Sequence, residues 1–362
     1  MSTLICPSVD LEGIPNVPGV FLIWPREGPP YIGKTNLLRR RLTRLLRPQE
    51  KQSRLLNLAA VAERVEYRVT GSAFESMMTL YRLARRYRPD DYKKYLKLRP
   101  PLFLKVNLTN PYPRCYVTRR LGSARALYFG PFTSRVAAER FQEAMLDLFQ
   151  MRRCSEELEP HPSHPGCIYG EMNMCLRPCQ AAVTEEQYRG EVVRVTEFLS
   201  SRGQSLIKQL ETNRERSSAE LQFEQAARLH KMLEKTLDAL KLNEDLARDL
   251  DHLHGVVIQR SVEPSAVELW FLYQGYLQRR QRFTFAVEEG QPLSLDRKLR
   301  DTIATLRLER GSSLQRVEHL ALLVRWYASS WKKGELLLFD SLDQAPYRKL
   351  VRAISRVATD QA

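Results

Sequence analysis

Four closely spaced cysteines constrain the fold of this 362-residue sequence more than any other feature. They are separated by twelve, seven and three residues, in the order Cys154, Cys167, Cys175 and Cys179. The loop that carries them has no clear helix or strand pattern, so a metal is the natural way to hold it. Four thiolates suit tetrahedral zinc or an iron–sulfur cluster, and the missing C-x2-C pair tilts slightly against zinc. His161 and His164 could replace one cysteine, and four unrelated buried thiols remain the plainer alternative.

The rest of the sequence favours a cytoplasmic protein with reduced thiols. No apolar run approaches the eighteen or so residues that a membrane span needs. The first residues lack the basic start and long apolar stretch of a signal peptide. We therefore expect metal chemistry rather than disulfides at the cysteines, and no membrane partner.

The charge balance points to a polyanionic partner. Lys and Arg together number 57 against 42 Asp and Glu, which gives a net charge of +15. A phosphate backbone is the commonest partner for such an excess, because each neutralised phosphate releases counterions. A basic protein that is merely soluble is the alternative. A lipid surface is disfavoured, since we find no basic amphipathic helix with aromatic residues on its opposite face.

Hydrophobic patterning predicts an α/β fold in four segments. Residues 1–100 form a small module with strand-like runs at 20–24 and 31–33, and basic helices at 37–46 and 73–87. Residues 101–183 hold further strands at 102–108 and 115–118, then a Y-F-G-P-F motif and the cysteines. The helix between them carries an apolar stripe formed by Ala138, Phe141, Met145 and Leu148.

The second half is predicted to be helical first and mixed afterwards. Residues 184–248 read as an α-helical hairpin that begins near Thr184. Its second apolar stripe consists of Ala226, Leu229, Leu233, Leu237 and Leu240. Residues 249–362 form a small α+β tail of unknown role, with strand-like runs at 255–258, 267–273 and 282–287. Asp340 and Asp343 follow another strand-like run, and we interpret this D-x-x-D as a helix cap.

Two of these motifs resemble the UvrC family, the nuclease subunit of bacterial nucleotide excision repair. The segment from Cys167 to Cys179 is similar to the C-x7-C-L-x-P-C segment of that family, and residues 128–132 resemble its Y-F-G-P-F/Y motif. The resemblance covers about residues 15 to 245. It implies that the four cysteines hold a [4Fe–4S] cluster, with zinc as the alternative. It also implies an excinuclease role in DNA repair, with double-stranded, damaged or distorted DNA as partner.

The first module resembles a GIY-YIG nuclease domain through Pro18–Phe21 and Tyr31–Lys34. In that family two tyrosines, a lysine and an arginine surround the phosphate, and a glutamate holds one divalent metal, Mg²⁺ or Mn²⁺. The resemblance assigns catalytic roles to Tyr31, Lys34 and Arg41. The first tyrosine is replaced by Phe21, and the glutamate position is occupied by Leu80.

The missing carboxylate leaves two hypotheses open. Glu75 lies five residues before position 80, which places it about 140° around the helix. The first hypothesis is an active endonuclease in which Asp90, Asp91 or Glu75 holds the metal through a shifted loop. The second is a catalytically degenerate adaptor that binds DNA without cutting it. In both, Lys34, Arg39, Arg40 and Arg41 are expected to contact phosphates, and a merely solvated basic helix face is the alternative.

The helical segment resembles the UVR motif over residues 219–229. In the UvrC family this hairpin docks onto a matching hairpin of UvrB, so the resemblance assigns partner binding to Leu221, Phe223, Ala226 and Ala227. An ordinary amphipathic core helix is the alternative. The family continues into an RNase H-like nuclease and a helix-hairpin-helix domain, and we expect this chain to lack both.

Overall fold

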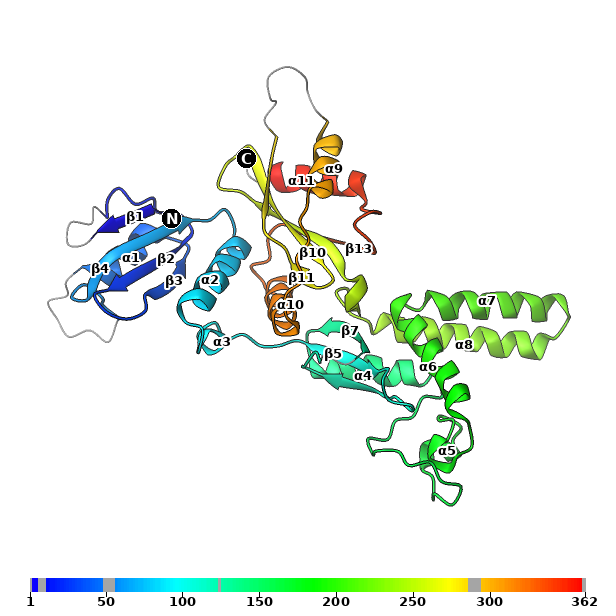
Figure 1. Ribbon diagram of the computed structural model, residues 1–362. Coiled ribbons are helices and arrows are strands. Elements are labelled where there is room, and N and C mark those ends of the chain that lie inside the picture. Colours follow the sequence, from blue (N-terminus) through cyan, green and yellow to red (C-terminus); the bar gives the residue numbers. More distant parts are fainter. Residues whose placement is uncertain (1, 6–10, 48–55, 123–124, 286–293, 360–362) are drawn as a thin grey trace.

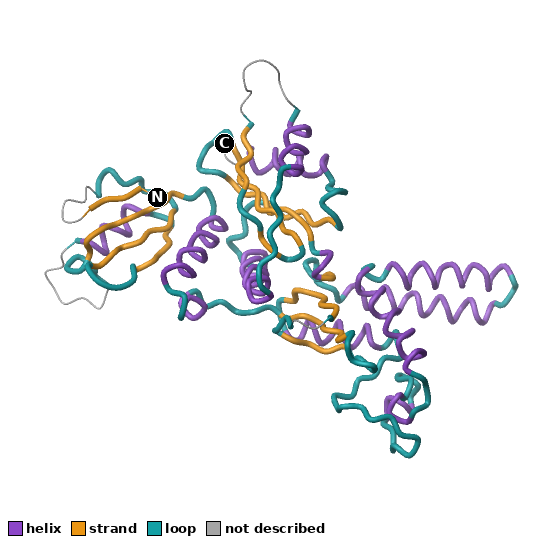
Figure 2. Tube along the Cα trace, viewed as in Figure 1, coloured by secondary structure: helices purple, strands orange, loops and turns teal. Residues whose placement is uncertain are grey.

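The computed structural model describes residues 2–5, 11–47, 56–122, 125–285 and 294–359. Within these residues the fold is a mixed α/β arrangement of three small antiparallel sheets with helices around them (Figure 1). Figure 2 shows that the sheets lie in separate parts of the molecule and that a long helical pair projects away from them. No helix within the described ranges has the length and apolar character needed to cross a membrane.

The N-terminal module is a four-stranded sheet in the order β1-β4-β2-β3. The strands are β1 (Ser2–Ile5), β2 (Gly19–Pro25), β3 (Tyr31–Thr35) and β4 (Ala62–Val69). One apolar cluster joins Phe21 and Ile23 to helix α1 (Leu38–Leu46). Phe21 is buried and its ring packs over Gly33, where a Cβ atom would lie 2.4 Å from Cζ of that ring. Glycine is therefore required beneath this aromatic ring.

Helix α2 (Ala73–Tyr87) covers the other face of the same sheet, where Leu22 and Ile32 pack. Its bounds are those predicted from the sequence. The Ser72 side chain caps it by accepting from the Glu75 amide at 3.0 Å. A one-turn helix, α3 (Tyr92–Tyr95), follows Pro89.

The middle region is a second sheet with the order β6-β5-β7-β8. Its elements are β5 (Leu102–Asn107), β6 (Cys115–Thr118), β7 (Ala126–Phe132), α4 (Arg135–Leu146) and β8 (Arg248–Asp249). The Y-F-G-P-F motif forms the end of β7, where Gly130 has a φ of 152° and a Cβ would meet the Leu102 carbonyl at 2.9 Å. The apolar stripe of α4 is buried as predicted, with Leu148 just beyond the end of the helix.

The helical segment shares one apolar core with this sheet, because residues from 102 to 247 form a single cluster. Its helices are α6 (Glu185–Ser200), α7 (Gln204–Ala219) and α8 (Phe223–Lys241). Thr184 and Gln187 form a capping box at the start of α6. The predicted stripe on α8 is wrong at one position: Leu237 is exposed, and Thr236 is buried in its place. Both sets of positions average 3.5 residues per step, so the helical period alone does not distinguish Thr236 from Leu237.

The C-terminal region is a five-stranded sheet in the order β11-β10-β9-β13, with β12 paired to β10. Its elements are η2 (Leu250–His252), β9 (His254–Arg260), β10 (Ala266–Tyr273), β11 (Tyr276–Leu277), β12 (Gln281–Thr284), α9 (Leu295–Ala304), α10 (Ser313–Tyr327), β13 (Glu335–Phe339) and α11 (Tyr347–Thr359). The predicted run at 282–287 ends earlier, at Thr284, and positions 286–287 lie outside the described residues. Asp340 does not cap α11; its carboxylate lies 3.5 Å from Arg202.

The N-terminal and C-terminal regions meet along α2. Phe74, on α2, packs edge-on against Trp270 at 5.1 Å and Trp326 at 5.2 Å between ring centroids. Both tryptophans are buried and belong to β10 and α10. Segments separated by some 200 residues thus share one apolar cluster, which also includes Leu22 and Ile32 of the first sheet.

Candidate nucleic-acid interface and cysteine centre

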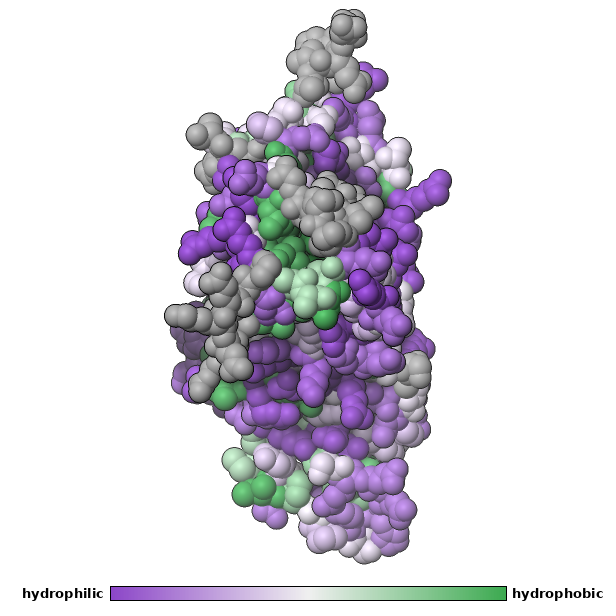
Figure 3. All heavy atoms as spheres, turned by 90° about the vertical axis from the view of Figure 1, so that its left-hand side faces the viewer, coloured by the Kyte–Doolittle hydropathy of each residue, from purple (hydrophilic) through white to green (hydrophobic). Residues whose placement is uncertain are grey.

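Helix α1 presents arginines to solvent around a cavity of about 880 Å³, here called the α1 cavity. The predicted residues Arg39, Arg40 and Arg41 all line it, and the structure adds Arg44 and Arg47. Figure 3 views the molecule from the left-hand side of Figure 1, and the described residues on that face are mostly hydrophilic. Grouped guanidinium groups of this kind suit the oxygens of a phosphate backbone.

Two contacts fix the start of α1. The Arg39 Nε donates to the Ile14 carbonyl at 2.6 Å, and the Asn16 side-chain oxygen accepts from the Arg40 amide at 3.2 Å. The arginine side chains are therefore carried by a helix end that is tied to the preceding loop.

The three predicted catalytic residues lie on both sides of the first sheet. Cross-strand pairs place Tyr31 opposite Ile23 and Lys34 opposite Val20, so the two side chains alternate between faces. Tyr31 packs in the cluster under α1, the helix that carries Arg41. Lys34 belongs to the face covered by α2.

Lys34 contacts the C-terminal region instead of α1. Its ammonium lies 5.4 Å from the centre of the Trp331 ring. Although the side chain is exposed, partial desolvation and then the nearby Arg325 lower the pKa of Lys34. Arg325 in turn donates to the Leu96 carbonyl at 2.9 Å, which ties α10 to the segment after α3.

The position to which the resemblance assigns a metal ligand is occupied by an apolar side chain. Leu80 is half-buried and packs against the cluster shared by α2 and the C-terminal region. Glu75, which is 1% exposed, accepts from the Gly71 amide at 2.9 Å and forms an ion pair with Arg280, with Arg68 at 3.8 Å. Burial raises the pKa of Glu75, and the Gly71 amide and Arg280 oppose that rise. Its oxygens are thus committed to contacts inside the fold.

The loop after α2 offers two further carboxylates. Asp91 binds Arg88 through two hydrogen bonds, of 2.9 and 2.5 Å, and this contact lowers the pKa of Asp91. Asp90 is exposed. Of the three replacements that the sequence suggested for the missing ligand, Glu75 and Asp91 are paired with arginines in the structure.

The four clustered cysteines lie in one loop region around α5 (Ile168–Glu171) and η1 (Pro178–Gln180). Burial raises the pKa of the Cys175 thiol to about 11, and the other three cysteines, which lie close enough to act on it, add to the rise. The Arg177 amide donates to Cys175 Sγ and the Arg152 guanidinium donates to Cys154 Sγ, both at 3.4 Å. Such donors suit thiolates, and the donor set fits a soft metal.

The two histidines of this loop are engaged in local contacts. Within the described ranges, no three His, Cys, Asp or Glu side chains are placed to share a metal ion. His161 Nδ1 contacts Ser163 Oγ at 2.6 Å, and His164 Nδ1 accepts from the Gly166 amide at 3.0 Å, so both histidines take part in local turns. The five cysteines in the described ranges are all free thiols.

The predicted partner-binding residues lie at the tip of the α7–α8 hairpin, which projects from the molecule in Figure 1. Leu221 is 72% exposed and Phe223 is 66% exposed, while Ala226 is half-buried and Ala227 exposed. Two large apolar side chains at an exposed turn are unusual for a core helix and typical of a contact surface.

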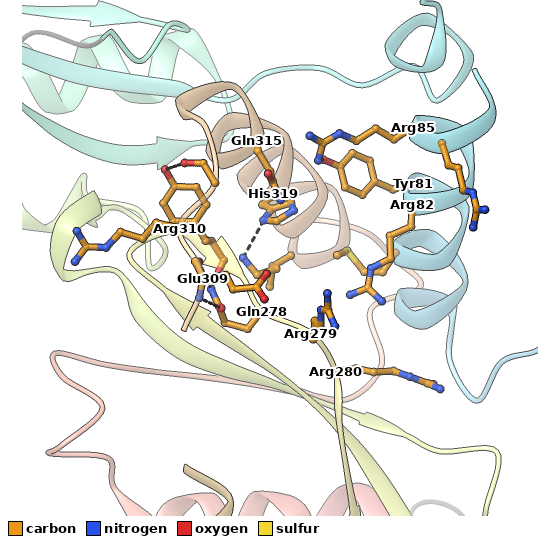
Figure 4. A pocket seen from close by; sticks show the side chains of 15 residues that line it. Tyr81, Arg82, Arg85, Gln278, Arg279, Arg280, Glu309, Arg310, Gln315 and His319 are labelled. Carbon is orange, nitrogen blue, oxygen red and sulfur yellow. Dashed lines mark hydrogen bonds between the residues drawn. The ribbon is translucent and has the colours of Figure 1, made fainter. Parts of the chain in front are cut away.

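Sequence reasoning missed a second group of arginines. A cavity of about 730 Å³, here called the arginine cavity, lies between α2 and the C-terminal region (Figure 4). Its arginines are Arg82, Arg85, Arg86, Arg279, Arg280 and Arg310. The signals were present in the sequence, as arginines at i, i+3 and i+4 on one helix and the run Q-R-R-Q-R at 278–282.

Comparison with known proteins supports the resemblance in part. Residues 102–198 match the family model of the UvrC/Cho excinuclease middle domain. This match runs past the expected boundary at residue 183 and into α6. No solved structure matches the chain.

Curated relatives match a larger part of the chain. UvrABC system protein C of Lachnospira eligens is 26% identical over 79% of this chain and 47% of its own length. The protein of the same name from Methanothermobacter thermautotrophicus is 29% identical over 76% of this chain and 46% of its own length. The chain is thus a UvrC homologue with a UvrC-type middle domain, and it spans about half the length of the curated relatives it matches.

Proposed function

We propose that this chain is a DNA-binding, UvrC-like protein of nucleotide excision repair whose N-terminal module holds phosphates without cutting them. The observation that carries this proposal is the apolar packing of Leu80 at the metal-ligand position. Without a carboxylate there, the module lacks the group that would hold a divalent cation, and with it the stabilisation of developing charge that the cation supplies. An adaptor is therefore favoured over an active endonuclease.

The α1 cavity supports the phosphate-binding part of the proposal. Its five arginines belong to one helix and its following residue, and two of them are anchored through Ile14 and Asn16. Phosphate contacts position a protein on a duplex without reading its sequence. We infer that the ligand is double-stranded DNA, and that distortion rather than base sequence selects the site.

The α7–α8 hairpin supports a second role, docking onto the hairpin of a UvrB-type protein. Leu221 and Phe223 are exposed at its tip, where a partner can cover them. Burial of such side chains typically dominates the free energy of an interface. A chain that binds both DNA and this partner would act as an adaptor.

For the cysteine loop we propose a [4Fe–4S] cluster, with zinc as the alternative. Cys154, Cys167, Cys175 and Cys179 would hold it, and it would staple a loop that has little regular structure. Anaerobically purified protein should contain iron and absorb broadly near ~400 nm, as iron–sulfur thiolate centres do. Cys175→Ser should lose that absorption, whereas the buried Cys115→Ser should keep it. Stoichiometric zinc without iron would contradict the cluster.

The DNA proposal is tested by salt-dependent binding of a lesion-bearing duplex. Arg40→Gln with Arg41→Gln should reduce the log–log salt slope by about 2, at ~0.9 for each phosphate that is no longer neutralised. The matched control is Arg140→Gln with Arg297→Gln, which removes equal charge from exposed positions that line neither cavity. Equal slopes for the two double variants would show that α1 is not the contact surface.

A further inference from the structure

The arginine cavity has walls from two distant parts of the chain. Arg82, Arg85 and Arg86 come from α2, and Arg279 and Arg280 from the segment between β11 and β12. Figure 4 shows Arg82 and Arg85 on one side, Arg310 on the opposite side, and Arg279 with His319 between them. The positive charges are thus spread along the cavity rather than focused on one point.

Most of these arginines lack a carboxylate partner. Among the described residues, no ion pair involves Arg82, Arg85, Arg86 or Arg279; Arg85 contacts the Tyr81 hydroxyl at 3.3 Å and Arg86 lies over the Tyr87 ring. The remaining cations are Arg280, which is paired with Glu75 and Glu268, and Arg310, which donates to the Tyr273 hydroxyl at 3.1 Å. Glu309 is the single carboxylate among the described lining residues.

The arginines also repel one another. Arg82 keeps contact with solvent, yet its pKa is lowered, first by partial desolvation and then by Arg280, Arg68 and Arg279. Bringing like charges together in a partly enclosed space costs free energy, and a bound anion offsets that cost. The unpaired guanidinium groups therefore call for a ligand with several negative charges.

Neutral polar groups between the two walls are already oriented. The His319 ring accepts from the Leu277 amide through Nδ1 at 3.0 Å, which leaves Nε2 as the nitrogen that bears hydrogen in the neutral ring. Gln278 is fixed by hydrogen bonds with the backbone of Glu309, donating at 3.1 Å and accepting at 2.8 Å. The cavity is thus lined by donors, and its shape is held by contacts that do not depend on a ligand.

We propose that the arginine cavity binds successive phosphates of one nucleic-acid strand. Guanidinium groups match phosphate oxygens in geometry, and several of them spaced along a trough match a chain of phosphates better than a single anion. Because one wall belongs to the N-terminal module and the other to the C-terminal region, the strand would bridge the two. The proposal assigns a role to the tail, and it is separate from the α1 cavity.

The test measures binding of a labelled single-stranded oligonucleotide to the full chain by fluorescence anisotropy. Arg82→Gln with Arg279→Gln should weaken binding at least five-fold and lower the log–log salt slope by about 1.4, at ~0.7 per phosphate on a single strand. The control pair Arg140→Gln with Arg297→Gln should leave affinity within two-fold. If the first pair lowers the melting temperature, Arg86→Gln with Arg279→Gln replaces it.

One outcome would overturn this inference: a folded cavity variant that binds the strand like the parent. Loss of binding in the Arg40→Gln, Arg41→Gln variant would then leave the proposed function standing without the second site. Binding of inorganic pyrophosphate to the parent but not to the cavity variant would in that case show that the site takes small polyphosphates and not nucleic acid.

Discussion

The two main helices of the N-terminal module cover opposite faces of one sheet and are used in opposite ways. Helix α1 points its arginines to solvent, and the contacts that fix it come from the neighbouring loop, through Ile14 and Asn16. Helix α2 is built into the C-terminal region, through the Glu75–Arg280 pair and a bond of 2.7 Å from the Tyr81 hydroxyl to Glu318. The arginine side of α1 is free to meet a ligand, whereas α2 is largely part of the protein's own core, apart from Arg82, Arg85 and Arg86 in the arginine cavity.

This difference bears on the proposal that the nuclease site is incomplete. A GIY-YIG site, by resemblance, needs a carboxylate on the second helix, and here that position is Leu80 in an apolar cluster. The carboxylate that α2 does carry near its start, Glu75, holds the C-terminal region. Helix α2 thus joins the N-terminal module to the C-terminal region, while the arginine side chains of α1 line an open cavity.

The largest effect is expected from removing the joint itself. Arg280→Ala leaves Glu75 and Glu268 as buried carboxylates with weaker pairing, and should lower the free energy of unfolding by about 3 kcal/mol. Equilibrium unfolding in denaturant measures this change in the free energy of unfolding. Arg189→Ala, which breaks an exposed pair on α6, should cost less than ~1 kcal/mol. Similar losses in both variants would mean that the α2 contact is no stronger than a surface pair.

Acid should weaken the same joint. His319 lies on α10 against Tyr81, near Arg82 and Arg85, and burial followed by those two charges lowers its pKa to about 4. In the unfolded chain His319 therefore binds a proton near pH 6.5, whereas in the folded chain it stays neutral until the pH approaches 4. The free energy of unfolding therefore keeps its full contribution from neutral His319 above pH 6.5. It decreases by up to about 3 kcal/mol as the pH falls toward 4.

The measurement is unfolding free energy against pH for the parent and for His319→Gln. The difference between the two proteins should shrink steadily between pH 6.5 and pH 4. A constant difference over that range would show that His319 titrates normally and that this part of the joint is open to water.

A smaller effect on stability is expected at the hairpin. Phe223→Ala removes a side chain that is 66% exposed, so the free energy of unfolding should change by less than ~0.5 kcal/mol. Binding to a UvrB-type hairpin should weaken by more than ~1 kcal/mol, as measured by calorimetry. Leu233→Ala, in the buried part of α8, is the matched control and should lower stability by about 2 kcal/mol or more. If the Phe223→Ala variant binds the UvrB-type hairpin as tightly as the parent does, the docking role is wrong.

Local structure could be predicted well from the sequence, because its causes are local. The bounds of α2 follow from a Ser72 cap, an apolar period of 3.6 and a following Pro89. The strands at 20–24 and 115–118 follow from β-branched and aromatic residues between turns. The exposure of Phe223 is implied by the resemblance to the UVR motif and not by the helical period, because the same period also fits a core helix.

Pairing between distant segments could not be predicted. Glu75 pairs with Arg280, 205 residues away in the sequence, and Tyr81 bonds to Glu318, 237 residues away. No local sequence pattern predicts such contacts. The arginine cavity could not be predicted for the same reason, because each of its two walls, taken alone, is an ordinary basic stretch of sequence. Asp340 was misread because its partners, Arg202 and Arg248, belong to other elements.

The central claim is that the module holds DNA without cutting it. The direct measurement is nicking of a lesion-bearing duplex by the full chain with Mg²⁺ or Mn²⁺, with and without a UvrB-type partner. We predict no nicking above background under conditions where the duplex is bound. A metal-dependent cut that Arg41→Ala abolishes would contradict the claim, and would identify the exposed Asp90 as the carboxylate to test next as the displaced ligand.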